Sequence, residues 1–415
     1  MGIERRPDGA FLFTVFVVVL GALCGLMLVW GNLWSGLTDP RGISRISVKP
    51  PTWDFTNLWY GTRLALDGEA HVLFDPEAYR AGLRSLFGPH IYDSEWSYPP
   101  QTLLLGIPLA NLPVLLAYAI WTLGTMGLLV FAARRMWLPK SACLLLLVSP
   151  GVLVNSMFGQ NGALTTSLLM LGLYSAVGRP ALGGGLFAVL TFKPQFGLLV
   201  PFALAASGRW AAFGWTIVFA AAVGVMTTWM FGTEVWIGFL EVTRPLMQDI
   251  MQAPYGQPYH ANAVTAFALA RALGADLSAA YAIQAAFAAG AVCATLWLWR
   301  RPGVDLSLRC AATGPLVLLA TPYSWSYDMV VTTFTAAVLF VRHGHRLGLV
   351  TGLAWLWPVF TGPITSAALP LGPVVLLALA WVALREVAGS EAANDGSETP
   401  SSRDAIPVGR TVGQN

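Results

Sequence analysis

The sequence predicts an all-α, polytopic membrane protein with a long polar segment directly after its first transmembrane helix. Hydrophobic residues make up 56% of its 415 positions and charged residues 11%, whereas a soluble domain carries about 25% charged residues. The apolar residues form long continuous runs, not the alternating segments of about ten residues that build a barrel. Because lipid offers the backbone no water to bond, these runs are expected to cross the membrane as helices.

The apolar runs accommodate about twelve spans with both termini in the cytoplasm. Arg5 and Arg6 place the N-terminus inside by the positive-inside rule. The first run is too long for a signal-peptide core and is interpreted as an uncleaved span. The remaining basic clusters are also cytoplasmic if the spans are approximately 11–30, 113–133, 141–155, 162–178, 181–192, 195–208, 210–231, 276–300, 305–320, 328–342, 346–360 and 370–385. Several of these segments are short for a bilayer, so the predicted number of spans is twelve with a margin of two.

Three polar regions are expected outside the cell, all within a single membrane domain, 1–388. A polar tail, 389–415, is predicted to be disordered and cytoplasmic. The first outer region, 31–112, holds eight of the 21 acidic residues: Asp39, Asp54, Asp67, Glu69, Asp75, Glu77, Asp93 and Glu95. The second, 232–275, includes Glu234, Glu241, Arg244, Asp249 and His260, and the third is the short TPYSWSYD at 321–328. With no soluble catalytic domain in view, any chemistry is expected at the outer face of the membrane.

The segment 53–68 in the first outer region is predicted to form an amphipathic helix lying along the membrane interface, since its apolar residues recur at helical spacing. Asp54 stands at its start. A carboxylate there can cap the free backbone N–H groups of the helix. It can also act as a general base toward a hydroxyl acceptor at the membrane surface.

A Tyr-Pro-Pro sequence at 98–100 predicts an extended entry to a short juxtamembrane helix, Gln101–Ala110, because proline restricts the residue before it. Just upstream, Asp93 and Glu95 are two carboxylates that either are solvated or hold a metal or substrate. Neither interpretation is decided by spacing alone.

Lys193 is one of only three lysines in the chain and lies between two apolar segments, in LTFKPQFG. An ammonium group there is costly unless it reaches the interface or has an anionic partner. The predicted topology puts it at the outer face, where a lipid phosphate would be a fitting partner. A lysine that merely extends to the headgroup region from a helix end is the other interpretation.

Two polar turns are also expected at the outer face. One contains Asn155, Gln160 and Asn161, and the other contains Tyr323, Trp325, Tyr327 and Asp328. Aromatic rings beside amides and carboxylates suit a sugar, although aromatic belts at membrane interfaces have the same composition. No P-loop, GxGxxG, HExxH or GxSxG pattern stands in a suitable context, so nucleotide-driven, zinc-dependent and hydrolase chemistry has no support.

Taken together, these motifs resemble the polytopic glycosyltransferases of the GT-C fold and, more narrowly, glycosyltransferase family 87, which includes polyprenyl-phosphomannose-dependent mannosyltransferases. The matching residues are Asp54–Phe55 with Tyr60–Gly61 and Gly68, Tyr98–Pro100 with Pro108 and Leu112–Pro113, Gly159–Asn161, and Lys193–Pro194. They cover most of 50–210. One departure is Ser326, where that branch tends to have histidine after Ser-Trp, which leaves the sugar open between mannose and another hexose or pentose.

The resemblance implies a GT-C-type bundle in a bacterial inner membrane that transfers a hexose or pentose from a polyprenyl-phosphate donor to a lipid or glycan hydroxyl. It makes Asp54 the general base of an inverting reaction and Lys193 the ligand of the donor phosphate. Substrate contacts are expected from Tyr98, Gln160, Asn161, His260, Tyr327 and Asp328. No metal, other cofactor or nucleic acid is expected, and the oligomeric state is left open.

Two alternatives remain open. Twelve spans with both ends inside also describe a secondary transporter, although transporters place their ionisable residues near the middle of the bilayer. A non-catalytic lipid-binding or assembly protein is the third possibility. If Asp54 and Lys193 form one site, they are expected to open onto one shared cavity, since base and donor phosphate must flank a single reacting centre; a separation of more than about 15 Å with no shared cavity would exclude such a site.

Overall fold

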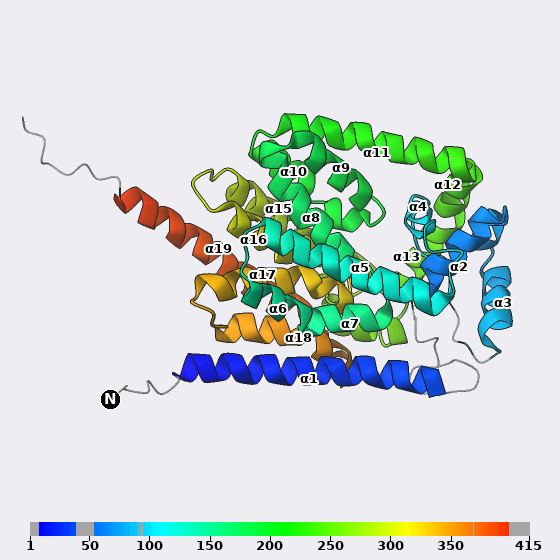
Figure 1. Ribbon diagram of the computed structural model, residues 1–415, viewed down its shortest axis with the longest axis horizontal. Helices are drawn as coiled ribbons and strands as arrows, with labels where there is room; N and C mark the ends of the chain where they lie inside the picture. The colour runs from blue at the N-terminus through cyan, green and yellow to red at the C-terminus, as the bar shows by residue number, and fades with distance from the viewer. Residues whose placement is uncertain (1–7, 39–53, 90, 92–93, 368, 398–415) are drawn as a thin grey trace, which may run out of the picture.

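The fold was obtained as a computed structural model that describes residues 8–38, 54–89, 91, 94–367 and 369–397 (Figure 1). Within these residues the regular elements are helices, accompanied by one isolated antiparallel bridge between Ala263 and Trp325. Arg5, Arg6, Asp39 and Asp93 lie outside the described residues. The predictions made for them stay predictions.

Five helices of the described chain are long and apolar enough to cross a membrane: α1 (Gly9–Thr38), α5 (Val114–Arg135), α11 (Trp210–Phe231), α15 (Leu277–Trp299) and α19 (Gly372–Ser397). A sixth span is formed if α6 (Lys140–Leu147) and α7 (Pro150–Phe158), which meet at an angle of 46°, cross together. Shorter helices fill the rest of the bundle: α8 (Gly162–Gly178), α9 (Pro180–Leu190), η2 (Pro194–Gly197), α10 (Val200–Ala206), α16 (Leu306–Ala320), α17 (Val330–Arg342) and α18 (Leu349–Ala367). Helices thus occupy all twelve predicted segments, but only five or six have the length and hydropathy of a full span.

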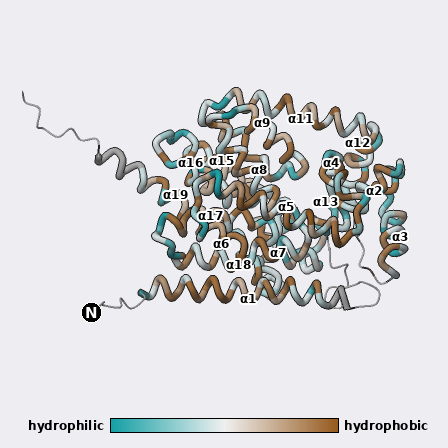
Figure 2. Tube along the Cα trace, in the orientation of Figure 1, coloured by the Kyte–Doolittle hydropathy of each residue, from teal (hydrophilic) through white to brown (hydrophobic). Residues whose placement is uncertain are grey.

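Helix α11 shows most clearly that lipid surrounds the bundle. Of its 22 residues only Ala212, Thr227 and Phe231 are buried, and the Trp229 side chain is 79% exposed. Figure 2 shows hydrophobic residues along most of both α11 and α1. Apolar surface of this extent is stable only in a hydrocarbon environment, where each helix satisfies its own backbone groups. The chain is therefore a multi-pass membrane protein.

The smaller elements gather at one end of the long axis (Figure 1). There lie α2 (Phe55–Leu66), η1 (Ala70–Phe74), α3 (Pro76–Phe87), α4 (Thr102–Gly106), α12 (Glu234–Gly238), the π-helical turn η3 (Phe239–Thr243) and α13 (Arg244–Gln252). Three further elements complete the fold: η4 (Pro258–Asn262), α14 (Ala266–Ala272) and η5 (Ser326–Met329). The start of α1 and the far end of α19 lie at the opposite end. Which side of the membrane each end occupies stays a prediction from the basic residues.

Several predicted boundaries need correction. Helix α1 continues beyond residue 30 to Thr38, and α19 continues to Ser397, so the chain is still helical where the disordered tail was expected to begin. The predicted helix Gln101–Ala110 is reduced to the five residues of α4. Helix α2 is buried except at Arg63 and Leu66, so other elements of the protein pack around nearly all of it, where one exposed face was expected. Its position relative to the membrane interface stays a prediction. Gly61 permits this packing, because a Cβ there would lie 2.5 Å from the Trp96 ring.

Candidate active site

A buried turn, Gly159–Asn161, forms the centre of the candidate site. Helix α7 ends at Phe158, and Gly159 adopts a left-handed conformation (φ +62°) that favours glycine at a helix C-terminus. Asn155 fixes the turn from both sides, since its carbonyl oxygen accepts from the Gln160 backbone N–H at 3.0 Å and its Oδ1 accepts from that of Gly162 at 2.6 Å. The side chains of Gln160 and Asn161 are thereby held in the interior.

Asp54 precedes α2 and faces this turn. Its side chain makes no capping hydrogen bond to the helix; its Oδ2 instead accepts from Nε2 of Gln160 at 3.0 Å. The backbone N–H of Asp54 donates to the carbonyl oxygen of Phe158 at 3.0 Å, which ties the start of α2 to the end of α7. The capping interpretation is therefore wrong for the side chain. The second oxygen, Oδ1, has no hydrogen-bond partner among the described residues and can accept a proton.

Lys193 is buried too, and it contacts the turn on the side opposite Asp54. Pro194 prevents α9 from continuing and leaves Lys193 extended (φ −132°, ψ 74°). Its Nζ donates to Oδ1 of Asn161 at 2.8 Å and to Oδ1 of Asp328 at 2.5 Å, and the residue is only 7% exposed. The aromatic rings of Phe196 and Tyr327 lie 5.4 and 5.3 Å from the ammonium group. Lys193 thus has a carboxylate partner in the interior and does not extend toward the headgroups.

Asp328 completes the cluster from η5. The residue is fully buried, and its Oδ2 accepts from the Trp325 backbone N–H at 3.1 Å. Burial raises the pKa of Asp328, while the nearby Lys193 ammonium opposes this rise by favouring the carboxylate. The turn 321–328 can approach α8 because residue 162 is glycine: a Cβ there would lie 2.2 Å from the Tyr327 carbonyl oxygen.

These contacts connect five polar side chains into one network, which we call the polar network: Asp54, Gln160, Asn161, Lys193 and Asp328. Four separate segments of the sequence contribute to it, and the adjacent residues Gln160 and Asn161 join its two ends. Five of the eight residues predicted for the site are therefore brought together. The network offers a carboxylate at one end and an ammonium–carboxylate pair at the other.

Two neighbouring pockets flank the network where one shared cavity was expected. The larger has a volume of about 660 Å³, and its polar side includes Tyr98, Gln160, Lys193 and Tyr327. The smaller, of about 10 Å³, is lined by Asp54 and Asn161 and has room for about one water-sized group. Tyr98 and Phe192 line both pockets. Asp54 and Lys193 belong to one hydrogen-bonded network, but Asp54 lines the smaller pocket and Lys193 lines the larger one.

The phenols around the larger cavity act as neutral hydrogen-bonding groups. Burial raises the pKa of Tyr98 and of Tyr323, and the carboxylates of Asp54 and Asp328 raise both further. Trp325 packs edge-on against Tyr323, with ring centroids 4.1 Å apart, and stacks on Tyr327 at 6.0 Å. Such a wall can stack on the C–H face of a sugar while donating to its hydroxyl groups.

His260 and Glu95 stand apart from this cavity. The His260 Nδ1 accepts from the backbone N–H groups of Gly256 and Gln257 at 3.2 and 3.1 Å, and burial lowers the pKa of the ring, which suits an accepting neutral imidazole. Its element η4 supports the site indirectly, since the carbonyl oxygen of Tyr259 accepts from the Trp325 indole at 3.3 Å. Glu95 forms an ion pair with Arg80.

The chain matches one family of known proteins. The pattern that characterises glycosyltransferase family 87 matches residues 96–322, more than half of the chain. The chain belongs to glycosyltransferase family 87. This confirms the resemblance seen in the motifs, while no match was found among curated proteins or among solved structures. Tyr98, Gln160, Asn161 and Lys193 lie inside the matched range; Asp54 and the pair Tyr327–Asp328 lie outside it and are tied to the site by geometry.

One wall of the cavity in this family 87 glycosyltransferase escaped the sequence-based prediction. It is formed by one face of α13, which contributes Arg244, Met247, Gln248 and Met251. These residues follow an i, i+3, i+4, i+7 spacing, the signal that could have found them. The segment contains no long apolar run, and Arg244 was noted only as one charge of the second outer region.

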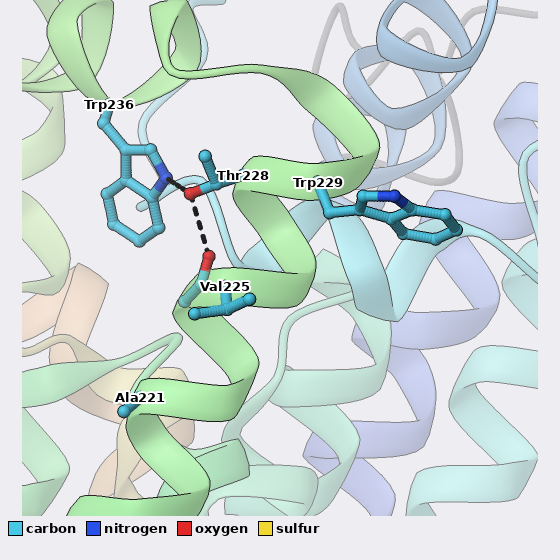
Figure 3. Close-up of a pocket in the computed structure, with 6 residues that line it drawn as sticks. Ala221, Val225, Thr228, Trp229 and Trp236 are labelled. Carbon is cyan, nitrogen blue, oxygen red and sulfur yellow. Dashed lines mark hydrogen bonds between the residues drawn. The ribbon is translucent and has the colours of Figure 1, made fainter.

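The family 87 glycosyltransferase has another hollow, on the outer surface of α11 and α12 (Figure 3). This groove of about 630 Å³ is lined by Ala221, Gly224, Val225, Thr228, Trp229 and Trp236. Its polar contacts are internal, since the Trp236 indole donates to Oγ1 of Thr228 at 2.9 Å and this hydroxyl donates to the Gly224 carbonyl oxygen at 3.0 Å (Figure 3). Its described lining residues include no titratable side chain, so this groove lacks the groups that sugar transfer requires and is not a candidate active site.

Proposed function

We propose that this membrane glycosyltransferase moves a sugar from a polyprenyl-phosphate donor to a hydroxyl group of a lipid or glycan acceptor, at the extracytoplasmic face and with inversion. The observation that carries the proposal is the polar network. It joins Asp54, a carboxylate with one oxygen unpaired among the described residues, to a buried ammonium group, Lys193, beside a cavity lined by aromatic residues.

In the proposed reaction Asp54 is the general base. Its Oδ1 takes the proton of the acceptor hydroxyl while that oxygen attacks the anomeric carbon from the face opposite the phosphate. The bond between the anomeric carbon and the phosphate oxygen breaks, and its electron pair stays on the phosphate. The anomeric configuration is thereby inverted, and one negative charge has in effect moved from Asp54 to the leaving group.

Lys193 is suited to receive that charge. Its ammonium has three N–H donors, of which Asn161 and Asp328 hold two, so the third is assigned to the leaving phosphate. Because both partners fix the ammonium before substrate arrives, little reorganisation is needed in the transition state. The donor's hydrocarbon chain would lie against the apolar part of the same cavity, at Leu198 and Phe239.

A transfer assay tests the proposal. The purified protein is supplied with radiolabelled polyprenyl-phosphate sugars and a membrane lipid extract, and the wild type is compared with Asp54→Asn. Loss of a general base lowers the rate by about 10²- to 10⁴-fold. Asp67→Asn is the matched control, since this carboxylate at the other end of α2 is exposed and, among the described residues, forms an ion pair with Arg63 alone.

Two results would contradict the proposal. Transfer by Asp54→Asn at the wild-type rate would exclude Asp54 as the base. Absence of transfer with every donor, combined with proton-coupled uptake into vesicles that contain the protein, would favour a secondary transporter.

A further inference from the structure

Arg244 is a cation at the polar cavity that the polar network does not use. Among the described residues that line the cavity, the charged side chains are Lys193 and Arg244. Arg244 is exposed and makes no hydrogen bond, ion pair or ring contact with any described residue. Since the planar guanidinium of arginine gains most from an anion, such as a carboxylate or a phosphate, that accepts from two of its N–H groups, an unpaired guanidinium at a cavity wall indicates a ligand with such an anion.

The helix that carries Arg244 is positioned by contacts at several points. Elements α12, η3 and α13 form one continuous helix, with a π-helical turn directly before Arg244; such turns are frequent at functional sites. Gly238 permits close contact with the first outer region, because a Cβ there would lie 2.3 Å from the ring of Phe74. At the other end, Nε2 of Gln252 donates to the Tyr281 hydroxyl at 2.8 Å.

The same helix face combines this charge with flexible apolar side chains. Met247 and Met251 line the cavity one and two turns after Arg244, and Sδ of Met247 accepts a weak hydrogen bond from the Tyr323 hydroxyl at 3.5 Å. Unbranched methionine side chains adapt to irregular apolar ligands. The face therefore matches a molecule with an anionic group followed by a hydrocarbon chain.

The charge of the cavity wall favours an anionic ligand. Lys193 is paired with the fully buried Asp328, so the pair adds no net charge to the cavity wall, and Arg244 leaves it with a single positive charge. A sugar joined to a polyprenyl chain through phosphate is a phosphodiester with one negative charge. Once the sugar is transferred, the remaining phosphomonoester gains a further negative charge.

We propose that Arg244 anchors the phosphate of the donor and that Met247 and Met251 contact the adjoining part of its prenyl chain. This inference rests on the polyprenyl-phosphate donor of the proposed function and assigns a different role to each of two cations. Arg244 binds the phosphate in the ground state, so its loss raises the KM for the donor. Lys193 meets the charge that develops during transfer, so its loss lowers kcat.

Binding measurements test the anchor without requiring turnover. Purified full-length protein in detergent is titrated with farnesyl phosphate, and with farnesol as the uncharged counterpart, and binding is followed by tryptophan fluorescence. Arg244→Gln is expected to weaken farnesyl phosphate binding by about 10- to 100-fold, the range for a charge-assisted hydrogen bond, and to leave farnesol binding unchanged. Arg244→Lys, which keeps the charge but not the planar fork, is expected to lie between wild type and Arg244→Gln.

Arg300→Gln is the matched control. Tyr281, near the start of α15, lines the polar cavity, whereas Arg300 directly follows the last residue of α15 and lines a separate pocket. This variant should bind farnesyl phosphate as the wild type does. Equal binding of farnesyl phosphate by wild type and Arg244→Gln, or no binding by the wild type, overturns the anchor. If sugar transfer occurs and its KM does not depend on Arg244, the inference fails and the proposed function stands. If farnesyl phosphate binding depends on Arg244 but no donor supports transfer, the proposed function fails and the phosphate site stands.

Discussion

The two walls of the polar cavity differ in how their polar groups are held. On one wall Lys193 and Asp328 are buried and paired with each other and with Asn161. On the other wall α13 has no buried residue, and Arg244 has no partner in the described structure. The first wall is organised by folding itself, whereas the second can adjust to a ligand. Substitutions on the first wall should therefore change both stability and catalysis, and substitutions on the second should change binding alone.

The largest effect on stability is expected for Lys193→Gln. Removing the ammonium leaves the carboxylate of Asp328 buried without its cation, which costs about 3–5 kcal/mol when one partner of a buried pair is lost. A thermal melt of the protein in detergent measures the loss, and sugar transfer should fall as well. A melt unchanged from the wild type would mean that the pair does not hold this wall together.

Replacing both partners of the pair sharpens the comparison. The double variant Lys193→Met with Asp328→Leu leaves no unpaired charge, and such replacements of buried pairs are often neutral or stabilising. Its melting temperature should therefore recover most of what Lys193→Gln loses, while transfer stays as low as in Lys193→Gln because the leaving phosphate has no ammonium. Recovery of transfer in the double variant would exclude a role for Lys193 in the reaction.

A smaller effect is expected for Gly162→Ala. The added methyl group would overlap the Tyr327 carbonyl oxygen, and forcing extra volume into a packed site costs about 1–3 kcal/mol. The turn that carries Asp328 should shift, so transfer should fall together with the melting temperature. Gly214→Ala is the control, because a Cβ on this glycine of α11 has no neighbour within 4 Å. Identical behaviour of the two variants would argue against close packing of the turn on α8.

The smallest effect on stability is expected for Arg244→Gln. An exposed side chain with no partner changes the free energy of unfolding by less than about 0.5 kcal/mol when substituted. Its melting temperature should equal that of the wild type, although its affinity for farnesyl phosphate should not. A clear drop in melting temperature would place Arg244 in the folded framework and remove the contrast between the two walls.

Much of the fold could be predicted because apolar runs and prolines mark the helices directly. Lys193 was also recognisable, since a lone lysine between apolar segments needs an anionic partner. Its partner could not be identified, because the contact with Asp328 joins residues 135 positions apart and depends on the packing of η5 against α8. The burial of α2 was missed for a similar reason: an amphipathic pattern shows which side faces the protein, but not that other elements cover the opposite side as well.

The wall formed by α13 shows a different limit. Its four cavity-lining residues follow helical spacing, yet the π-helical turn before Arg244 changes how the two halves of the helix are aligned. A pattern based on 3.6 residues per turn carries no information about such a turn. The charge of Arg244 was visible in the sequence; the direction in which it faces was not.

The turn that contains Gln160 and Asn161 sets one fixed distance within the polar network. Gln160 holds the base, and Asn161 holds the ammonium group. These two residues share a single peptide unit, whose Cα atoms lie about 3.8 Å apart. Covalent geometry therefore fixes the distance between the Cα atoms of these two residues, so movements of the surrounding helices leave this one distance within the network unchanged. Inserting one residue between Gln160 and Asn161 would increase the distance between these two residues. Proton removal would then be separated from departure of the phosphate, even if every side chain of the network were retained.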